Sequence, residues 1–335
     1  MARSTRERIT TRFDWKLPLA ILAATGLLAA PGAPAQVFLT KPPYVPTPQS
    51  TVDRMLELAR VGPDDFVIDL GSGDGRIVIT AAKKYGARGF GVDIDPQLVA
   101  LANANARAAA VDDRAQFYER DLFETDLSDA TVVTIYLLKR ATMKLRSRLL
   151  ALKPGTRIVS HAASMGDSTA DHFELLDVKD RVRPDAPGRT YIHFWIVPAK
   201  VAGTWRWSMP VGGRMRDYEF TAVQEFQTFS GTVRVGGTEA RIEGGRLTGE
   251  RVTLAFSVDI EGAPVQHRFA GRVAGDSIIG TVSLGSGPGR GESQWNAVRA
   301  TSPHGAARIL RGKVNLWAGP NVKRFTIHQR PEEAV

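Results

Sequence analysis

Apolar and polar positions alternate in blocks along the first half of the chain. Short apolar runs such as FVIDL (66–70) and TVVTIYL (131–137) predict buried strands, while the longer stretches between them have the one-sided apolar pattern of helices. A preceding helix is predicted to begin at Thr47, which can cap it, with Pro48 in the first turn. Such alternation favours a mainly parallel, Rossmann-like α/β sheet covered on both faces. The predicted strands are 66–70, 88–93, 115–119, 131–137, 157–161, 173–178 and 191–197, and the predicted helices are 76–84, 95–110 and 140–150.

The pattern changes after residue 199. Pairs of glycines recur, and apolar residues alternate with polar ones, as in the run from Val252 to Ile260. Short alternating strands joined by glycine turns predict an all-β domain, either an antiparallel sandwich or a small barrel. The chain therefore divides into an α/β domain over 36–200, a β-rich accessory domain over 201–300 and a C-terminal extension over 301–335.

The first thirty-five residues have the pattern of a targeting segment. Basic residues up to Lys16 precede an apolar run of fourteen residues, Leu17–Ala30, and Ala33-Pro34-Ala35 forms a small-x-small site before Gln36. The run is short for a membrane span of about twenty residues. We expect a cleaved secretory signal, with two alternatives: an uncleaved anchor that contacts the membrane through 17–30, and a misassigned start. The first two predict an exported protein, periplasmic or anchored in the inner membrane facing the periplasm, and a non-functional segment predicts a cytoplasmic one.

Composition narrows the chemistry that the chain can perform. The chain lacks cysteine, which excludes disulfides, thiolate metal sites and cysteine nucleophiles. The six histidines show no metal-ligand spacing, so we predict no metal site. The net charge of +9 is spread along the chain, and no segment is basic enough to argue for nucleic-acid binding. Nucleic acid is therefore not a favoured partner.

A glycine-rich turn follows the first predicted strand of the sheet, in the run DLGSGDGR (69–76). Gly71, Gly73 and Gly75 allow a tight turn and close approach of a ligand at the carboxyl edge of the sheet. The dinucleotide pattern G-x-G-x-x-G would need glycine at position 76, which is Arg76. Asp69 would repel a pyrophosphate but suits the ammonium and sulfonium of S-adenosylmethionine. S-adenosylmethionine is therefore favoured over another nucleotide and over a turn without a ligand.

Acidic residues end the next two predicted strands. Asp93 can accept hydrogen bonds from ribose hydroxyls, and Asp121, which precedes Leu122, can meet an adenine amino group. Each of these features is common alone, but their order after the glycine turn makes a specific set.

Residues 44–200 resemble a class I S-adenosylmethionine-dependent methyltransferase. YVPTP (44–48), MLELA (55–59) and DLGSGDGRIV (69–78) resemble a narrower group. It comprises the mitochondrial inner-membrane lysine methyltransferases of the adenine nucleotide translocase and of the ATP-synthase c-subunit, and their prokaryotic relatives. The resemblance covers about half of the chain and implies a seven-stranded methyltransferase sheet. It also implies that S-adenosylmethionine is bound by Asp69, Gly71, Ser72, Gly73, Gly75, Asp93, Ile94, Asp121 and Leu122, with Tyr44 and Thr47 lining the pocket.

The methyl acceptor is expected beyond the fourth strand of the sheet. Tyr136 there can orient an amine, and His161 and Asp167 are further candidates to touch the substrate. For each of the three, a purely structural role is the competing interpretation. A basic cluster over 139–153 can dock an acidic partner or lipid headgroups, or form a solvated helix face. After the fourth strand Tyr136-Leu137-Leu138 departs from the motif of the mitochondrial enzymes, which bears on lysine specificity.

Three functions are compatible with these features. The first is a methyltransferase acting on a protein side-chain amine, most simply lysine, of a protein that can be membrane-associated. The second is an exported binding or scaffold protein that keeps the methyltransferase fold without turnover, because S-adenosylmethionine is made in the cytoplasm. The third is a small-molecule methyltransferase with the same cofactor half.

Overall fold

The computed structural model describes residues 44–180, 188–285, 291–300, 315–319 and 322–326. The predicted targeting segment, residues 1–35, lies outside this part of the chain, as does most of the predicted extension over 301–335. Two strands of that extension, β17 (Asn315–Gly319) and β18 (Val322–Thr326), pair antiparallel with each other. In the described segments no helix is both long and apolar enough to span a bilayer.

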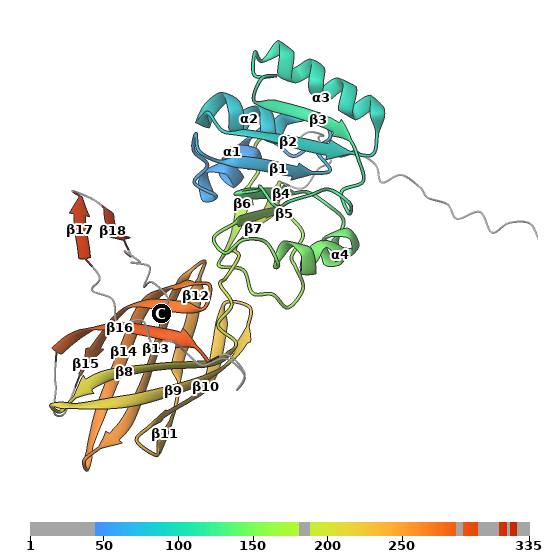
Figure 1. Cartoon of the computed structure of the whole chain (residues 1–335). Helices are drawn as coiled ribbons and strands as arrows, with labels where there is room; N and C mark the ends of the chain where they lie inside the picture. Colours follow the sequence, from blue (N-terminus) through green and yellow to red (C-terminus); the bar gives the residue numbers. More distant parts are fainter. Residues whose placement is uncertain (1–43, 181–187, 286–290, 301–314, 320–321, 327–335) are drawn as a thin grey trace, which may run out of the picture. The chain divides into compact units, whose positions relative to one another are not determined.

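The first half of the described chain folds into a seven-stranded sheet (Figure 1). The strand order is β3-β2-β1-β4-β5-β7-β6, parallel from β3 to β5, with β7 antiparallel to both of its neighbours. This arrangement confirms the predicted Rossmann-like seven-stranded sheet. Its strands are β1 (Phe66–Leu70), β2 (Arg88–Asp93), β3 (Ala115–Glu119), β4 (Val132–Ile135), β5 (Arg157–His161), β6 (His172–Asp177) and β7 (Arg189–Ile196).

Helices cover both faces of this sheet because alternate strand residues point to opposite sides. On one face α1 (Gln49–Leu58) and α2 (Arg76–Tyr85) pack against Val67, Val132 and Val159, and α3 (Pro96–Ala108) packs beside α2. On the other face α4 (Lys139–Leu149) packs against a cluster that includes Ile68 and Ile158. The carboxyl ends of β1, β2, β4 and β5 therefore meet at one edge of the sheet, between the two covered faces.

One helix start differs from its prediction. Helix α1 begins at Gln49 with Pro48 as its N-cap, and no side chain caps it. The hydroxyl of Thr47 is instead hydrogen-bonded to His161, 114 residues away in the sequence. The expected capping role of Thr47 was therefore wrong, because a tertiary partner takes its hydroxyl.

The second half of the described chain forms a nine-stranded antiparallel sheet in the order β11-β10-β12-β13-β14-β15-β16-β8-β9. An additional pairing of β9 with β10 closes eight of these strands into a barrel. The barrel alternative is thus confirmed over the sandwich. The strands are β8 (Gly203–Val211), β9 (Arg214–Glu225), β10 (Thr228–Val235), β11 (Thr238–Arg241), β12 (Glu243–Thr248), β13 (Arg251–Ile260), β14 (Ala263–Ala274), β15 (Ser277–Leu284) and β16 (Gly291–Arg299).

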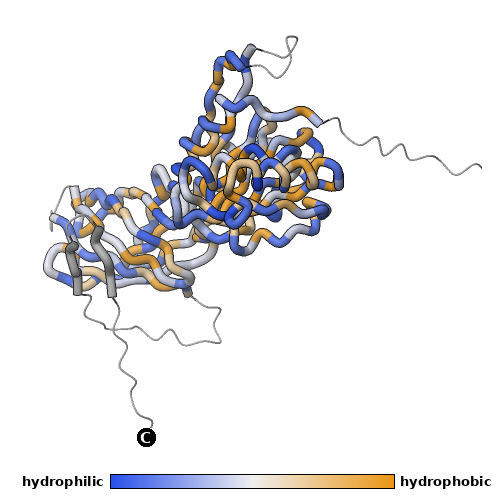
Figure 2. The backbone as a smooth tube through the Cα atoms, turned by 90° about the horizontal axis from the view of Figure 1, so that it is seen from above, coloured by the Kyte–Doolittle hydropathy of each residue, from blue (hydrophilic) through white to orange (hydrophobic). Residues whose placement is uncertain are grey.

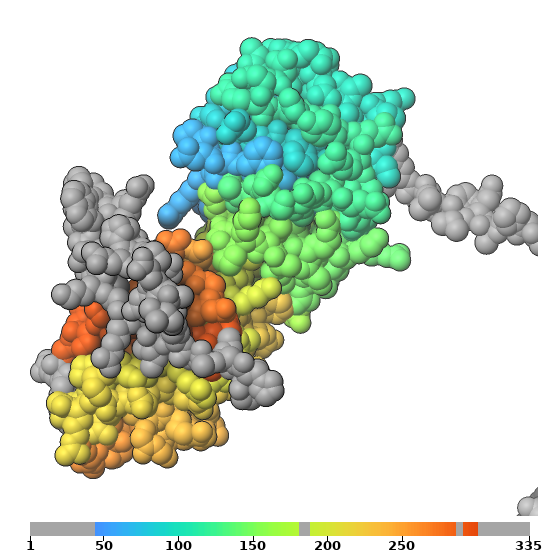
Figure 3. Space-filling view, viewed as in Figure 1, coloured from blue at the N-terminus to red at the C-terminus, as the bar shows by residue number. Residues whose placement is uncertain are grey.

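The interior of the barrel is filled by side chains. Every second residue of β13 is buried, from Val252 to Ile260, and the alternation of apolar and polar positions along the strands is visible in Figure 2. Trp205, Trp207 and Trp295 lie in this core, where Trp295 packs edge-on against Trp207. Figure 3 shows the side chains of the barrel strands in yellow to orange and those of the seven-stranded sheet and its helices in blue to green.

Candidate functional site

The turn between β1 and α2 is built from glycines in the left-handed region. Gly71, Gly73 and Gly75 have φ angles of +82°, +54° and +83°, which residues with a β-carbon rarely adopt. The backbone N–H groups of Gly71 and Ser72 both donate to the carbonyl of Val92 at 2.9 Å, which ties the turn to the end of β2. The predicted glycine positions are therefore those that the turn requires.

All three glycines also allow close approach of other side chains, and at Gly71 an added β-carbon would lie 2.9 Å from Cδ2 of Leu137. A β-carbon at position 73 would overlap the ring of Tyr44, and one at position 75 would lie 2.6 Å from Cζ of Phe117. Gly73 thus lets Tyr44 lie directly against the turn, whereas Gly75 lets α2 approach β3. The contact of Gly73 with Tyr44 shapes the ligand side of the turn, and the contact of Gly75 with Phe117 is internal packing.

Asp93 connects the glycine turn to the loop that follows β2. Its Oδ2 accepts a hydrogen bond from the backbone N–H of Gly73, and its Oδ1 accepts one from the backbone N–H of Asp95, each at 3.0 Å. The neighbouring Ile94 is 65% exposed, so an apolar surface stands beside this carboxylate. A carboxylate can accept hydrogen bonds from ribose hydroxyls, and an open apolar side chain can pack against an adenine ring.

Asp69 lies beneath the turn and not on its surface. It is 2% exposed, and its Oδ1 accepts a hydrogen bond from the hydroxyl of Thr134 at 2.7 Å. Burial raises the pKa of Asp69 to about 7, against the hydrogen bond from Thr134, and the charges of Asp93 and Asp74 raise it further. The carboxylates of Asp69 and Asp93 therefore favour a cation at this end of the sheet and oppose a pyrophosphate, whereas the charge of Asp74 is balanced by Arg76.

The remaining predicted adenine contacts follow β3. Asp121 is exposed, and its Oδ1 accepts a hydrogen bond from the backbone N–H of Phe123 at 2.7 Å. Leu122 is half-buried against the core of the sheet. The Asp121 carboxylate therefore organises its own loop and keeps its second oxygen available for hydrogen bonding.

The segment before α1, residues 44–48, passes beside the glycine turn, and we call it the N-terminal strap. The ring of Tyr44 lies against Gly73, and its hydroxyl interacts with Asp74. Burial, followed by the charge of Asp74, raises the pKa of Tyr44 to about 12, so the phenol stays protonated. Thr47 is 4% exposed, and its carbonyl oxygen accepts a hydrogen bond from Arg76 at 2.7 Å.

Tyr136 and His161 lie together on the acceptor side of the edge. Their rings are 3.8 Å apart between centroids and tilted by 32°. His161 is 3% exposed and hydrogen-bonded on both sides, through Nδ1 to Thr47 at 3.2 Å and through Nε2 to Thr190 at 2.8 Å. Burial lowers the pKa of His161 to about 4, so the imidazole is neutral at physiological pH. The structure thus brings two of the three predicted acceptor-side residues together.

Asp167 does not join this pair. Its side chain is 75% exposed and forms an ion pair with Arg146 of α4 at 2.6 Å. Arg146 lies about two helical turns from the start of α4, away from the carboxyl end of β4. The geometry therefore places Asp167 in a surface ion pair with α4.

Half of the basic residues in the predicted cluster over 139–153 make internal contacts. Arg148 donates to the carbonyls of Phe123 and Thr125, and the ammonium of Lys144 lies 3.9 Å from the centre of the Phe123 ring. Together with the Arg146–Asp167 pair, these contacts favour a structural role for this half of the cluster. Lys139 and Arg140, at the start of α4, are exposed.

Sequence reasoning missed several residues of the site. Asp74 and Arg76 form an ion pair at 2.6 Å within the glycine turn, and Thr134 and Thr190 hydrogen-bond to Asp69 and His161. The one available signal was Arg76 itself, because it replaces the glycine that a dinucleotide site would have. The two threonines gave no signal, since their partners are distant in the sequence.

These residues fit S-adenosylmethionine. The carboxylates suit its cationic groups, Asp93 and Ile94 suit its ribose and adenine, and the hydroxyl of Ser72 is buried without a partner beside the turn. Among the residues that the structure describes, no group of three or more histidine, aspartate or glutamate side chains could hold a metal ion. The site therefore offers the carboxylates and the apolar surface that a cationic, nucleoside-containing cofactor needs.

Comparison with known proteins agrees with this geometry. Residues 69–172 match the ANTKMT methyltransferase domain. A protein-lysine N-methyltransferase of Saccharolobus islandicus is 50% identical over 121 residues, which cover 36% of this chain and 75% of the relative. The mouse adenine nucleotide translocase lysine N-methyltransferase is 35% identical over 42% of this chain and 62% of its own length. The mouse lysine N-methyltransferase of the ATP-synthase c-subunit is 33% identical over 39% and 52%.

Among solved structures, an RNA methyltransferase from Salinibacter ruber in complex with S-adenosyl-L-homocysteine is 49% identical, with a TM-score of 0.42. It aligns with 47% of this chain, which covers 96% of that protein. The matches to all of these proteins leave at least half of the chain uncovered. The Saccharolobus islandicus relative is 50% identical and is covered over three quarters of its length. The chain therefore belongs to the family of S-adenosylmethionine-dependent methyltransferases that contains these lysine N-methyltransferases.

Proposed function

We propose that this protein transfers methyl groups from S-adenosylmethionine to lysine side chains of a protein substrate. The observation that carries the proposal is the 50% identity to a protein-lysine N-methyltransferase. The matched methyltransferase domain, residues 69–172, also contains the glycine turn, Asp93 and the Tyr136–His161 pair. Cofactor residues and candidate acceptor residues therefore lie in the same related segment.

The chemistry of lysine methylation suits the acceptor side of this site. Bound S-adenosylmethionine supplies an electrophilic methyl group, and the attacking lysine must be a neutral amine. The imidazole of His161 is neutral because its pKa is about 4, so it adds no positive charge that would repel an incoming ammonium. We assign to Tyr136, whose ring rests on His161, the role of orienting the amine. Correct alignment of amine and methyl group can contribute several kcal/mol, so a strong base is not required.

Transfer of a radiolabelled methyl group into fractionated cell extract tests this function. We expect label in protease-sensitive, nuclease-resistant material, and methyl-lysine after acid hydrolysis. Asp93→Asn should abolish most of the transfer. Asparagine has one side-chain oxygen, whereas both oxygens of Asp93 accept hydrogen bonds from the backbone. Label in nucleic acid or in small molecules would contradict the proposal, and cofactor binding without any transfer would favour the non-catalytic scaffold.

A second measurement separates acceptor positioning from cofactor binding. Tyr136→Phe should lower kcat with little change in S-adenosylmethionine affinity, whereas Asp93→Asn should weaken the affinity itself. Asp167→Asn is a matched acidic-to-amide control, since Asp167 lies in a surface ion pair, and it should leave both values near those of the wild type. A loss of transfer in Asp167→Asn comparable to that in Asp93→Asn would reassign the acceptor side.

We further propose that the protein is exported and acts at the cell envelope, on a substrate that can be membrane-associated. The support is the sequence of residues 1–35, with its basic start, apolar run and small-x-small site. Mass measurement of the native protein should give an N-terminus at Gln36. An intact Met1 in a soluble cytoplasmic fraction would contradict export.

A further inference from the structure

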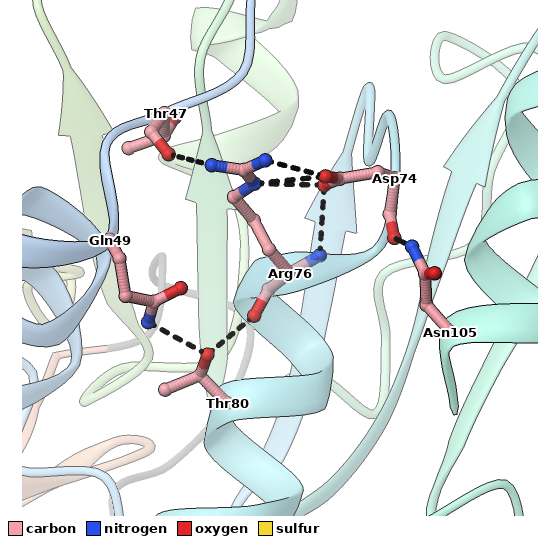
Figure 4. Close-up of polar contacts among 6 residues, drawn as sticks. All are labelled: Thr47, Gln49, Asp74, Arg76, Thr80 and Asn105. Carbon is pink, nitrogen blue, oxygen red and sulfur yellow. Dashed lines mark hydrogen bonds and ion pairs between the residues drawn. The ribbon is translucent and has the colours of Figure 1, made fainter. Parts of the chain in front are cut away.

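The N-terminal strap is held against the glycine turn by an arginine–carboxylate pair. Figure 4 shows Arg76 between the carbonyl oxygen of Thr47 and the carboxylate of Asp74. Nη1 of Arg76 donates to Thr47 at 2.7 Å, while Nε and Nη2 donate to the two carboxylate oxygens of Asp74 at 2.9 Å and 2.6 Å. Although burial opposes it, the hydrogen bonds and charge of Arg76 lower the pKa of Asp74, so the pair stays ionised. A planar guanidinium can make these three contacts at once, and an ammonium cannot.

The backbones of both residues of this pair are fixed from neighbouring helices. Thr80 of α2 donates to the carbonyl of Arg76 at 2.7 Å and accepts from Gln49 of α1 at 3.1 Å (Figure 4). Asn105 of α3 donates to the carbonyl of Asp74 at 2.9 Å. The pair is therefore anchored within α2 and by α3, and Gln49, which directly follows the strap, connects α1 to the same point.

Thr47 makes a different contact with each of its two oxygens. Its carbonyl binds Arg76 and so belongs to the cofactor turn. Its hydroxyl binds Nδ1 of His161, whose ring lies on Tyr136 and so belongs to the acceptor side. Thr47 is also buried, which restricts both contacts to one geometry. One residue of the strap therefore bonds directly to both halves of the site.

The other end of the strap lies where the cofactor binds. The ring of Tyr44 rests on Gly73, and the backbone N–H of Gly73 donates to Asp93, the residue that we assign to the ribose. A ligand held by Asp93 would therefore lie close to the backbone on which the Tyr44 ring rests. Because Tyr44 and Thr47 belong to the same short strap, any resulting shift reaches His161 through the hydroxyl of Thr47.

We propose that the N-terminal strap couples the cofactor site to the acceptor side, with Arg76 as the residue that positions it. Binding of the cofactor at the turn alters the environment of His161 and Tyr136, and by thermodynamic reciprocity the acceptor alters cofactor affinity. The inference rests on the cofactor half of the proposed function and is independent of the acceptor's identity.

Titration of the full-length protein with S-adenosyl-L-homocysteine tests the coupling without an acceptor. The ring nitrogens of ¹⁵N-labelled histidine are followed by NMR, with the His161 signals assigned by their loss in His161→Gln, and affinity is measured in parallel by calorimetry. In the wild type we expect the His161 ring signals to move on saturation, while those of the barrel residue His267 stay in place.

Two conservative variants separate the contacts of Thr47. Thr47→Val removes the hydroxyl and keeps the carbonyl, so S-adenosylhomocysteine should bind within about threefold of wild-type affinity while the His161 response is lost. Arg76→Lys should weaken binding by about tenfold, the change expected from one lost hydrogen bond, and should also reduce the response. Arg88→Lys, at an exposed position of β2, is the matched arginine control and should behave as the wild type.

Kinetic constants give a readout that a merely structural role would not move. With cell extract as the acceptor source and radiolabelled S-adenosylmethionine as the methyl donor, Thr47→Val should lower turnover while the KM for S-adenosylmethionine changes little. The coupling is overturned if the His161 signals of the wild type do not respond to S-adenosylhomocysteine. It is also overturned if they respond in Thr47→Val and Arg76→Lys as fully as in the wild type. Either result leaves the methyltransferase function intact. Complete absence of S-adenosylhomocysteine binding in the wild type overturns both.

Discussion

The buried carboxylate of Asp69 should make cofactor binding depend on pH. Its pKa is raised to about 7, so below that pH the group is mainly neutral and above it mainly ionised. A cationic cofactor favours the ionised form, so S-adenosylmethionine affinity should rise between about pH 6 and pH 8. If the bound cofactor lowers the pKa of Asp69 by about one unit, the gain approaches about tenfold. Calorimetry across this range measures it.

Asp69→Asn provides the control for that dependence. The amide keeps an oxygen that can accept from Thr134 but cannot ionise, so affinity should be low and flat with pH. Ionisation of Asp69 has the opposite effect on the stability of the folded protein, which falls as pH rises. Because the folded-state pKa of Asp69 lies above the unfolded value, the folded protein binds the extra proton and loses stability as pH rises through about 7. Asp69→Asn should therefore stabilise the protein more at about pH 8 than at about pH 5, and an equal effect at both would contradict the assignment.

At the residue scale, the sequence predicts backbone requirements better than side-chain partners. Gly71, Gly73 and Gly75 were expected from their spacing, because a left-handed turn is a local property. Thr47 was expected to cap a helix, an equally local role, but its hydroxyl binds His161. The Arg76 contact with the Thr47 carbonyl was not foreseeable for the same reason: its two partners meet only after the sheet has formed.

At the scale of elements, helix α2 begins and ends at glycines that differ in what surrounds them. Gly75 at its start has φ +83° and stands where a β-carbon would be 2.6 Å from Phe117. Gly75→Ala should destabilise the domain by about 2–4 kcal/mol, the sum of backbone strain and overpacking. The thermal transition that S-adenosylhomocysteine raises reports this change.

Gly86→Ala at the other end of α2 is the matched comparison. Gly86 has a similar φ of +72°, but the nearest atom to an added β-carbon is 3.5 Å away, on Pro63. Only the backbone strain remains, so the cost should be about 1–2 kcal/mol. Equal costs at the two positions would show that the approach of Phe117 to the turn is not tight.

The boundaries of elements followed closely from the apolar pattern. β1, β2, β3 and β5 occupy the predicted residues because each is a short buried run bounded by polar or turn residues. β4 ends at Ile135, earlier than the run TVVTIYL suggests, since Tyr136 and Leu137 leave the sheet toward the site and α4. Apolar residues that line a site cannot be distinguished by pattern from those that line a core.

At the scale of the whole molecule, the choice between sandwich and barrel could not be made from the sequence. Both have alternating strands and glycine turns, and they differ in whether the sheet closes. Eight strands follow one another in the sheet from β10 to β9. The barrel closes because β9 also pairs with β10. That pairing is a property of twist and register along many strands, which alternation alone does not encode.

The buried clusters of the seven-stranded sheet and of the barrel contain no common residue. The barrel cluster runs from Ala199 to Ala297, and the three clusters of the sheet lie between Val52 and Val197. Two separate cores predict two thermal transitions, and only the transition of the sheet should rise with S-adenosylhomocysteine, because the ligand binds that part alone. Phe256, buried in the barrel among His267 and Phe269, allows the two to be separated.

Phe256→Ala should lower the barrel transition, with a cost of about 3–5 kcal/mol for a large cavity in a packed aromatic core. The transition of the sheet and the affinity for S-adenosylhomocysteine should stay at wild-type values, since no residue of the glycine turn or of the Tyr136–His161 pair belongs to the barrel cluster. Differential scanning calorimetry with and without ligand measures both transitions in the intact chain. Leu56 lies on the buried face of α1, in a core of the sheet. Leu56→Ala should give the converse result and lower only the ligand-sensitive transition. If Phe256→Ala moved both transitions together, the two cores would unfold as one cooperative unit, and the barrel would contribute directly to the stability of the methyltransferase site.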